Sequence, residues 1–213
     1  MAARRDVAQN CGCSLACSRE TEARFAAFET EFRKWAARIN LVAPSTLPDL
    51  RNRHIADSAQ ILAYAGAVKT VIDMGSGGGF PGLILGIMLA ETPGNQVHLI
   101  ESNGKKCAFL RHVTRELALP VTVHMARIED VLADLPQPDI ITARALAPLP
   151  LLLGLAAPHM LAGVPGFFHK GREWREEVAA AHGHWRFDLL EHPSLIDAES
   201  VILQVRHLAP LAA

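Results

Sequence analysis

The chain has 213 residues, of which 50% are hydrophobic and 20% are charged, a composition typical of a globular protein with one α/β domain. Its formal net charge of −1 excludes a global basic field, so a nucleic-acid partner would have to contact a local basic patch. The apolar runs are too short to span a bilayer, and the N-terminus lacks the apolar segment of a signal peptide, so we expect a cytoplasmic protein without a membrane partner.

Residues 1–20 are expected to form a flexible leader. The leader holds three of the four cysteines, Cys11, Cys13 and Cys17. Their spacing lacks the paired Cys-x-x-Cys ligands of a zinc site, and no histidine lies close by. The sequence therefore predicts no metal site.

Residues 21–66 are predicted to form a helical extension. Apolar residues recur at spacings of three and four, as on one face of an amphipathic helix that begins at about residue 20: Phe25, Phe28, Phe32, Trp35 and Ile39. The two prolines of the segment 44–50 interrupt this pattern. A second helical stretch, residues 50–66, ends at Gly66, a typical C-terminal cap.

Residues 67–213 are predicted to form the main domain, in which strands alternate with helices. The expected strands are 70–74, 97–101, 121–125, 139–143 and 166–170, and helices are expected at about 81–90 and 103–119. Such alternation indicates parallel pairing with helices on both faces. The tail segments "RFDLLEHP" and "ESVILQVRHL" leave no room for a helix between them, so we expect an antiparallel hairpin at the edge of the sheet. The predicted fold is α/β with a mostly parallel, seven-stranded sheet.

The stretch "VIDMGSGGGFPG" (71–82) joins the first of these strands to a helix through a glycine-rich turn. Asp73 lies at the strand end, and Pro81 suits the first position of the helix because its missing N–H would have been unpaired. In doubly wound sheets, ligands bind beyond the carboxyl ends of the strands. The free backbone amides of the turn predict a site for a ligand with an anionic or carboxylate group.

Two ligand classes fit this turn. Gly77, Gly79 and Gly82 match the dinucleotide pattern G-x-G-x-x-G, with the acid Glu101 about twenty residues further on. An NAD(P)-dependent oxidoreductase therefore stays an alternative, although the single tyrosine, Tyr64, starts no Tyr-x-x-x-Lys motif.

S-adenosylmethionine enzymes use a similar turn, with one acid just before the first glycine and another at the end of the second strand. Asp73 and Glu101 occupy those two places. We predict S-adenosylmethionine as the cofactor, its ammonium group held by Asp73 and its ribose hydroxyls by Glu101. After the third strand, Ile128 offers an apolar contact to the adenine and Glu129 an acceptor for its amine. The alternative for Glu129 is that it caps a helix or faces water.

The absence of two motifs narrows the range of possible methyl acceptors. The chain has no Asn-Pro-Pro-aromatic turn, and no cysteine follows a proline, which argues against methylation of amino groups and of cytosine C5. A purine N7 already carries a lone pair, so its methylation requires positioning rather than a general base. Basic residues that follow the strand ends predict contacts with nucleic-acid phosphates: Lys105, Lys106, Arg127, Arg144, Lys170 and Arg172. A non-catalytic RNA-binding module is a further alternative.

Seven fragments together resemble one family. They are "NLV" (40–42), "RHIADS" (53–58), "DMGSGGGFPGLILGI" (73–87), "ESNGKKCAFL" (101–110), "ARIED" (126–130), "ARAL" (143–146) and "HKG" (169–171). Their order and sequence resemble the rRNA small subunit methyltransferase G family, also called glucose-inhibited division protein B, from about residue 25 to the C-terminus. The leader has no counterpart in that pattern, and Gly104 in the opening turn of a predicted helix departs from it.

The resemblance implies a Rossmann-like class I methyltransferase that uses S-adenosylmethionine, without a metal, to methylate N7 of one guanine in the decoding region of 16S ribosomal RNA. The substrate is naked RNA or a small-subunit particle, and we expect a monomer. The family's cofactor contacts fall on Gly75, Phe80, Ile128, Glu129 and Arg144, and we add Asp73 and Gly77 from the turn and Glu101 from the end of the second strand. Arg144 and Lys170 are predicted to position the reactants, without a certain catalytic residue.

The RNA is expected to contact the basic residues Arg53, His54, Lys105, Lys106, Arg127, Lys170 and Arg172. Of these, Arg53 and His54 belong with Asp57 and Ser58 to a family motif on the extension. That motif either shapes the RNA side of the pocket or serves as a structural cap.

Overall fold

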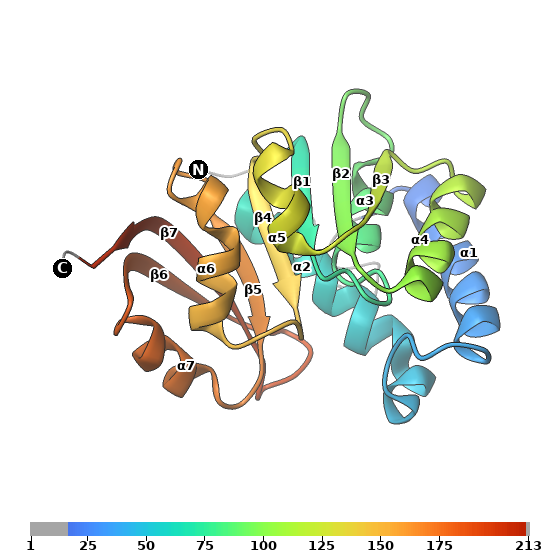
Figure 1. Cartoon of the computed structure of the whole chain (residues 1–213). Helices are drawn as coiled ribbons and strands as arrows, with labels where there is room; N and C mark the ends of the chain where they lie inside the picture. The colour runs from blue at the N-terminus through green and yellow to red at the C-terminus, as the bar shows by residue number, and fades with distance from the viewer. Residues whose placement is uncertain (1–16, 212–213) are drawn as a thin grey trace, which may run out of the picture.

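The computed structural model describes residues 17–211, which form a sheet with the strand order β3-β2-β1-β4-β5-β7-β6 (Figure 1). The strands are β1 (Thr70–Met74), β2 (Gln96–Glu101), β3 (Val121–Met125), β4 (Ile140–Arg144), β5 (Gly166–Lys170), β6 (Trp185–Pro193) and β7 (Val201–Pro210). Strands β1 to β5 pair in parallel, whereas β7 runs antiparallel to both β5 and β6. The predicted seven-stranded sheet with an antiparallel C-terminal edge is confirmed.

Helices cover both faces of the sheet. They are α1 (Arg19–Ala36), α2 (Asp57–Ala65), α3 (Gly82–Leu89), α4 (Gly104–Glu116), α5 (Ile128–Val131), α6 (Leu149–Met160) and α7 (Trp174–Ala181), with short 3-10 turns at Pro44–Asp49 and Leu132–Asp134. One hydrophobic cluster holds residues of α1 to α4 against one face, and a second holds residues of α5 to α7 against the other. Figure 1 accordingly shows α2 and α3 behind the sheet and α5 and α6 in front of it.

Most predicted elements agree with the structure within a few residues, and two differ. The helix predicted over 103–119 spans only Gly104–Glu116. Asn103 caps its start, where its Oδ1 accepts from the backbone N–H groups of Lys105 and Lys106, and Ala118 beyond its end has a positive φ of 48°. The stretch predicted as one helix over 50–66 begins as a π-helix, Arg51–Ala56, and becomes α-helical only in α2. Its predicted end at Gly66 is confirmed by the positive φ of 78° there.

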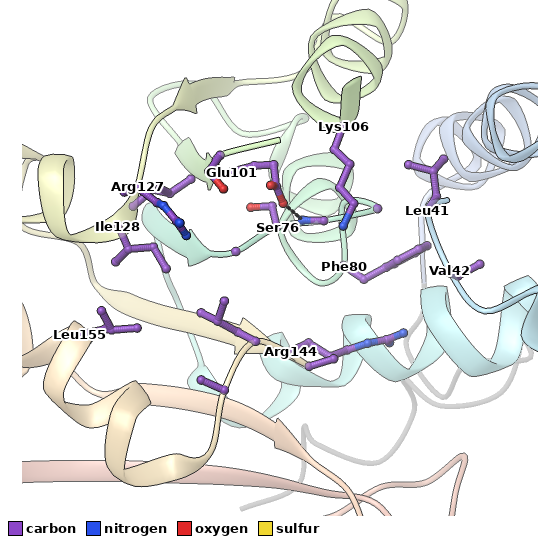
Figure 2. Close-up of a pocket in the computed structure, with 18 of the residues that line it drawn as sticks. Leu41, Val42, Ser76, Phe80, Glu101, Lys106, Arg127, Ile128, Arg144 and Leu155 are labelled. Atoms are coloured by element: carbon purple, nitrogen blue, oxygen red, sulfur yellow. Dashed lines mark hydrogen bonds between the residues drawn. The ribbon is translucent and has the colours of Figure 1, made fainter. Parts of the chain in front are cut away.

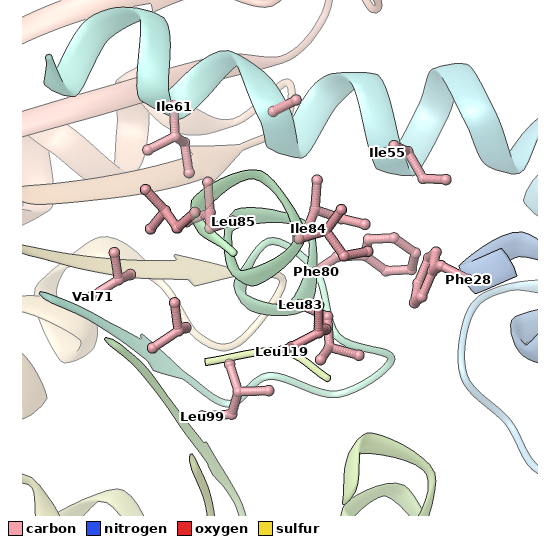
Figure 3. Close-up of a cluster of buried hydrophobic side chains, with 14 of the residues drawn as sticks. Phe28, Ile55, Ile61, Val71, Phe80, Leu83, Ile84, Leu85, Leu99 and Leu119 are labelled. Atoms are coloured by element: carbon pink, nitrogen blue, oxygen red, sulfur yellow. The ribbon is translucent and has the colours of Figure 1, made fainter. Parts of the chain in front are cut away.

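The N-terminal extension shares its core with the sheet. Phe25, Phe28 and Phe32 of α1 are buried, and the rings of Phe28 and Phe32 lie 5.8 and 5.4 Å from that of Phe80 in the glycine-rich turn. Figure 3 shows Phe28 facing Phe80 across this cluster. The extension therefore braces the turn directly.

Residues 1–16, including Cys11 and Cys13, lie outside the described part of the chain, so the predicted leader stays a prediction. Within residues 17–211, no helix is both long and apolar enough to cross a bilayer. The same residues hold no group of three or more His, Cys, Asp or Glu side chains able to bind a metal ion.

Candidate functional site

The glycine-rich turn after β1 closely approaches two other segments. A Cβ atom on Gly78 would lie 2.7 Å from the carbonyl oxygen of Leu41, so only glycine lets the extension lie against the turn. Gly75 has a φ of +66°, and a Cβ there would lie 2.6 Å from the Leu146 side chain. Glycine is thus required at position 78 by a close backbone contact and favoured at position 75 by the positive φ.

Glu101, at the end of β2, is fastened to this turn. Its Oε2 accepts from the backbone N–H of Gly77 at 2.9 Å, and its Oε1 accepts from that of Asn103 at 2.7 Å. The dashed line in Figure 2 marks the bond to the turn. With only 9% of its surface exposed, the carboxylate is pre-oriented at the edge of the sheet where a ligand's hydroxyl groups would meet it.

The Asp73 side chain does not face the site where the sequence predicted a contact with the cofactor. Its side chain is fully buried, its Oδ2 accepts from the Gly82 N–H at 3.2 Å, and its Oδ1 accepts from the Thr142 hydroxyl at 2.8 Å. It does not line the cavity described below. Strand side chains alternate between faces, so Asp73 points with Val71 toward α3 and ties the first residue of that helix to β1 and β4. A direct contact with the ligand's ammonium group is not supported by this orientation.

A cavity of about 590 Å³ opens over the turn. It is lined by all of the predicted cofactor residues other than Asp73, namely Gly75, Gly77, Phe80, Glu101, Ile128, Glu129 and Arg144. Figure 2 shows the side chains of Lys106 and Arg127 extending over the same space from α4 and from the loop after β3. The strand order explains this gathering, because the carboxyl ends of β1, β2, β3 and β4 meet at one edge of the sheet.

Arg144, His54 and Phe80 form one wall of this cavity. The Arg144 guanidinium donates to His54 Nδ1, so the proton of that ring is on Nε2, which donates to the Thr46 hydroxyl at 2.8 Å. Burial and the adjacent charge of Arg144 lower the pKa of His54 from 6.5 to about 3. His54 also stacks on Phe80, with 5.0 Å between the ring centroids. His54 is therefore a neutral, fixed part of the wall.

A second cavity, of about 540 Å³, adjoins the first and shares Thr46, His54, Arg144 and residues 145–147 with it. Its remaining lining comes from the motif 53–58, the end of β5, the first turn of α7 and the loop between β6 and β7. The two cavities together form a two-chambered site, with Arg144 between the chambers.

The motif "RHIADS" fastens these elements together. Asp57 Oδ1 accepts from Ser194 Oγ at 2.9 Å and from Gln60 Nε2 at 3.1 Å, and its Oδ2 lies 3.3 Å from Arg144 Nη1 and 3.6 Å from His169 Nε2. Both carboxylate oxygens are thus occupied by groups of the protein. This arrangement matches the structural role that the sequence left open for the motif.

The predicted RNA-contacting residues fall into two groups: five are exposed or half-buried, whereas His54 and Lys170 are buried and bonded within the protein. Lys105, Arg127 and Arg172 are exposed, and Lys106 is half-buried at the rim of the first cavity. Arg53 pairs with Asp197 at 3.7 Å beside the second cavity, and Arg172 pairs with Glu199. Lys170 is buried instead: its Nζ donates to the Ala147 carbonyl at 2.6 Å and lies 2.7 Å from Glu177 Oε2, so it is not positioned as a surface contact for phosphate.

The prediction missed several lining residues. Leu41, Val42 and Thr46 bring the extension to the first cavity, and Ser76 and Leu155 complete its floor. For Leu41 and Val42, the family fragment "NLV" (40–42) could have indicated their place at the site. Glu177 in α7 and Ser200 in the β6–β7 loop line the second cavity, and no local pattern marks either of them.

Several solved structures with a similar fold carry the name of a methyltransferase. An O-methyltransferase from Bacillus cereus in complex with SAH has a TM-score of 0.59 at 15% identity, covering 85% of this chain and 90% of that chain. A SAM dependent methyltransferase from Aquifex aeolicus has a TM-score of 0.58 at 16% identity, covering 84% and 97%. These similarities show the fold, a Rossmann-like α/β methyltransferase fold.

Comparison of the sequence with protein-family models identifies the family to which this chain belongs. The family model described as rRNA small subunit methyltransferase G matches residues 21–206. The chain belongs to this family. Curated relatives named Ribosomal RNA small subunit methyltransferase G are 51% identical in Chelativorans sp. (91% of this chain, 92% of the relative) and 52% identical in Rhizobium etli (92% and 97%). Membership of the rRNA small subunit methyltransferase G family confirms the resemblance carried by the seven fragments.

Proposed function

We propose that this member of the family transfers a methyl group from S-adenosylmethionine to N7 of a guanine in 16S ribosomal RNA. The observation that carries the proposal is the first cavity, which Glu101 and Arg144 from two strand ends line together with Ile128 from the start of α5 and the glycine-rich turn, in a chain of this family. The family match does not favour the two alternatives, an NAD(P)-dependent oxidoreductase and a non-catalytic RNA-binding module.

The first cavity has the features that S-adenosylmethionine requires. Glu101 would hold the ribose hydroxyls, and Ile128 and Glu129 would contact the adenine. At Gly77 the turn leaves room that a Cβ would fill, since no atom lies within 3.4 Å of that position. Asp73 would act indirectly, by fixing the turn through Gly82. The volume of about 590 Å³ lies within the roughly 300–1,000 Å³ of small-molecule sites.

When bound, S-adenosylmethionine supplies a methyl group on a sulfonium centre, and transfer to N7 leaves the electron pair of the broken carbon–sulfur bond on sulfur. The guanine gains one positive charge and releases no proton from N7, so no general base is needed there. The contribution of the protein is to position the base and to manage charge. Arg144, held by Asp57 and His54, lies between the two cavities and is suited to position the two reactants against each other.

The RNA would contact the exposed and half-buried basic residues around the two openings. Lys105, Lys106 and Arg127 lie on one side and Arg53 and Arg172 on the other, and contacts with phosphates need no particular sequence. We propose that the protein acts as a monomer in the cytoplasm, on naked 16S RNA or on a small-subunit particle.

Mapping of N7-methylguanine tests the proposal. Borohydride–aniline treatment cleaves RNA at this base, so 16S RNA from cells with the protein should be cut at one guanine that stays intact in RNA from cells without it. Identical cleavage in both RNAs, together with no methyl transfer in vitro to any unmethylated form of 16S RNA, would refute the proposal.

A further inference from the structure

The second cavity has the size, position and polarity of a nucleobase site. Enzymes that do chemistry on a base commonly act on a single strand or flip the base out of the stack, and bind the base in a pocket. The cavity of about 540 Å³ shares its wall at Arg144 and residues 145–147 with the first cavity, where the methyl donor is proposed to bind. A base whose N7 faces this shared wall would turn its opposite edge toward the residues that only the second cavity contains.

In guanine, the edge opposite N7 carries two kinds of donor, the N1–H and the N2 amino group. An anionic acceptor with a free oxygen would recognise this edge. Three carboxylates line the second cavity, those of Asp57, Glu177 and Asp197. Their existing contacts decide which of them is available.

Asp57 is unavailable, because both of its oxygens already accept hydrogen bonds from Ser194, Gln60 and Arg144. Asp197 is 39% exposed, accepts from the Glu199 N–H and pairs with Arg53, so water competes for it at the rim. Glu177 differs from both. Its Oε2 accepts from the Leu149 N–H at 2.7 Å and lies 2.7 Å from Lys170 Nζ, whereas its Oε1 accepts no hydrogen bond from any residue within 17–211.

Glu177 is also held rigidly. Lys170 is buried and anchored to the Ala147 carbonyl at 2.6 Å, so Lys170 and the backbone N–H of Leu149 in α6 together fix one oxygen of the carboxylate. Only 25% of the Glu177 side chain is exposed, which makes each hydrogen bond to it stronger than one in water. Leu146, Pro148 and Ile196 add apolar surface to the same cavity for the faces of a base.

We propose that the second cavity receives the flipped-out guanine and that Glu177 Oε1 accepts from its N1–H and N2 amino groups. Adenine has no donor at either position, so Glu177 selects guanine. The same negative charge stabilises the positive charge that the base acquires on methylation. Lys170 is thereby a positioning residue that orients Glu177. This inference rests on the proposed function.

The variant Glu177→Gln tests the proposal. Leu149 N–H and Lys170 are both donors, so the glutamine must turn its oxygen toward them. Its NH2 group then faces the base, where it would oppose the N1–H and N2 amino donors of guanine. Glu176→Gln, an exposed neighbour in the same helix, is the matched control. Methyl transfer is measured on unmethylated 16S RNA or particles, with guanosine or inosine at the mapped target, because inosine lacks only the N2 amino group.

Wild-type protein and Glu176→Gln should prefer guanosine over inosine in kcat/KM. Glu177→Gln should lose about 10- to 100-fold in kcat/KM on guanosine and most of that preference, since a hydrogen bond to a charged group is removed. Independently of turnover, 7-methylguanosine 5′-monophosphate titrated with S-adenosylhomocysteine present should bind Glu177→Gln about 10-fold or more weakly than wild type. The affinity for S-adenosylhomocysteine itself should not change, because Glu177 does not line the first cavity.

Equal kinetics of Glu177→Gln and wild type on guanosine and inosine would overturn the inference. So would an equal loss of nucleotide and S-adenosylhomocysteine affinity, which would show that Glu177 only supports the fold. If the wild-type protein methylates no form of 16S RNA, the proposed function fails. If it methylates guanosine and inosine equally well, only the role of Glu177 fails.

Discussion

Replacement of Asp73 by asparagine should stabilise the protein at neutral pH. Burial raises the pKa of Asp73 from 3.8 to about 6, despite the hydrogen bonds from Thr142 and Gly82 that oppose this shift. Because the native state binds this proton more tightly than the unfolded chain, the contribution of Asp73 to stability is full below pH 3.8 and is lost as the pH rises to about 6. At about 1.4 kcal/mol for each pKa unit, the ionised carboxylate destabilises the fold by about 3 kcal/mol above pH 6.

Asparagine has the same shape and keeps both hydrogen bonds. Its oxygen can accept from the Gly82 N–H, and its NH2 group can donate to the Thr142 hydroxyl, which accepts as readily as it donates. The substitution therefore removes the charge and leaves the attachment of α3 to β1 in place.

Urea unfolding followed by circular dichroism, at several values between about pH 4 and about pH 8, measures the effect. Groups that titrate equally in both proteins contribute nothing to the difference in unfolding free energy between Asp73→Asn and wild type. It should grow from near zero at about pH 4 to about 3 kcal/mol in favour of Asp73→Asn at about pH 7.5. A variant that is less stable than wild type at neutral pH, by an amount that shrinks toward acid, would refute the reasoning, because the ionised form would then be the stabilising one.

Three further substitutions test the turn and its wall. Glu101→Gln removes the charge that would accept from the ribose hydroxyls and turns an NH2 group toward one of the two backbone donors, Gly77 N–H or Asn103 N–H. Calorimetry should therefore show about 10- to 100-fold weaker binding of S-adenosylhomocysteine. Unchanged binding would contradict the role of Glu101 in holding the ribose. Gly82→Ala should lower the unfolding free energy by about 1–3 kcal/mol, because its Cβ would lie 2.2 Å from Leu99 Cδ2. Gly154→Ala in α6, where no atom lies within 4 Å of the added Cβ, should raise the unfolding free energy by up to about 1 kcal/mol. If Gly82→Ala were instead the more stable of these two variants, this packing would be contradicted. The lowered pKa of His54 predicts that wild type loses stability as the pH falls below 6.5 toward about 3, a loss that His54→Gln should reduce.

The sequence predicted the parts of the site that depend on local pattern. The apolar run of β1, the glycines and Pro81 determine a strand, a turn and a helix through neighbouring residues alone. Glu101 and Ile128 follow two further strands, and the geometry of a parallel sheet brings such positions to one edge. These residues therefore reach the same cavity without any knowledge of distant contacts.

The missed features depend on long-range contacts or on side-chain direction. Asp57 meets Arg144 and Ser194, which are 87 and 137 residues away in the sequence, so no local signal reveals its role. Glu177 reaches the second cavity only because α7 packs beside α6. The orientation of Asp73 follows from the alternation of side chains along β1, which places it on the same face as Val71 and outside the lining of the first cavity.

A crystal structure with S-adenosylhomocysteine tests the central claim most directly. It should show the ligand in the first cavity, with its ribose hydroxyls on Glu101, its adenine against Ile128, and the turn at Gly75 and Gly77 beneath it. Crystals soaked with this ligand in which that cavity stays vacant, or a structure with NADH in which a pyrophosphate lies across the turn, would contradict the account.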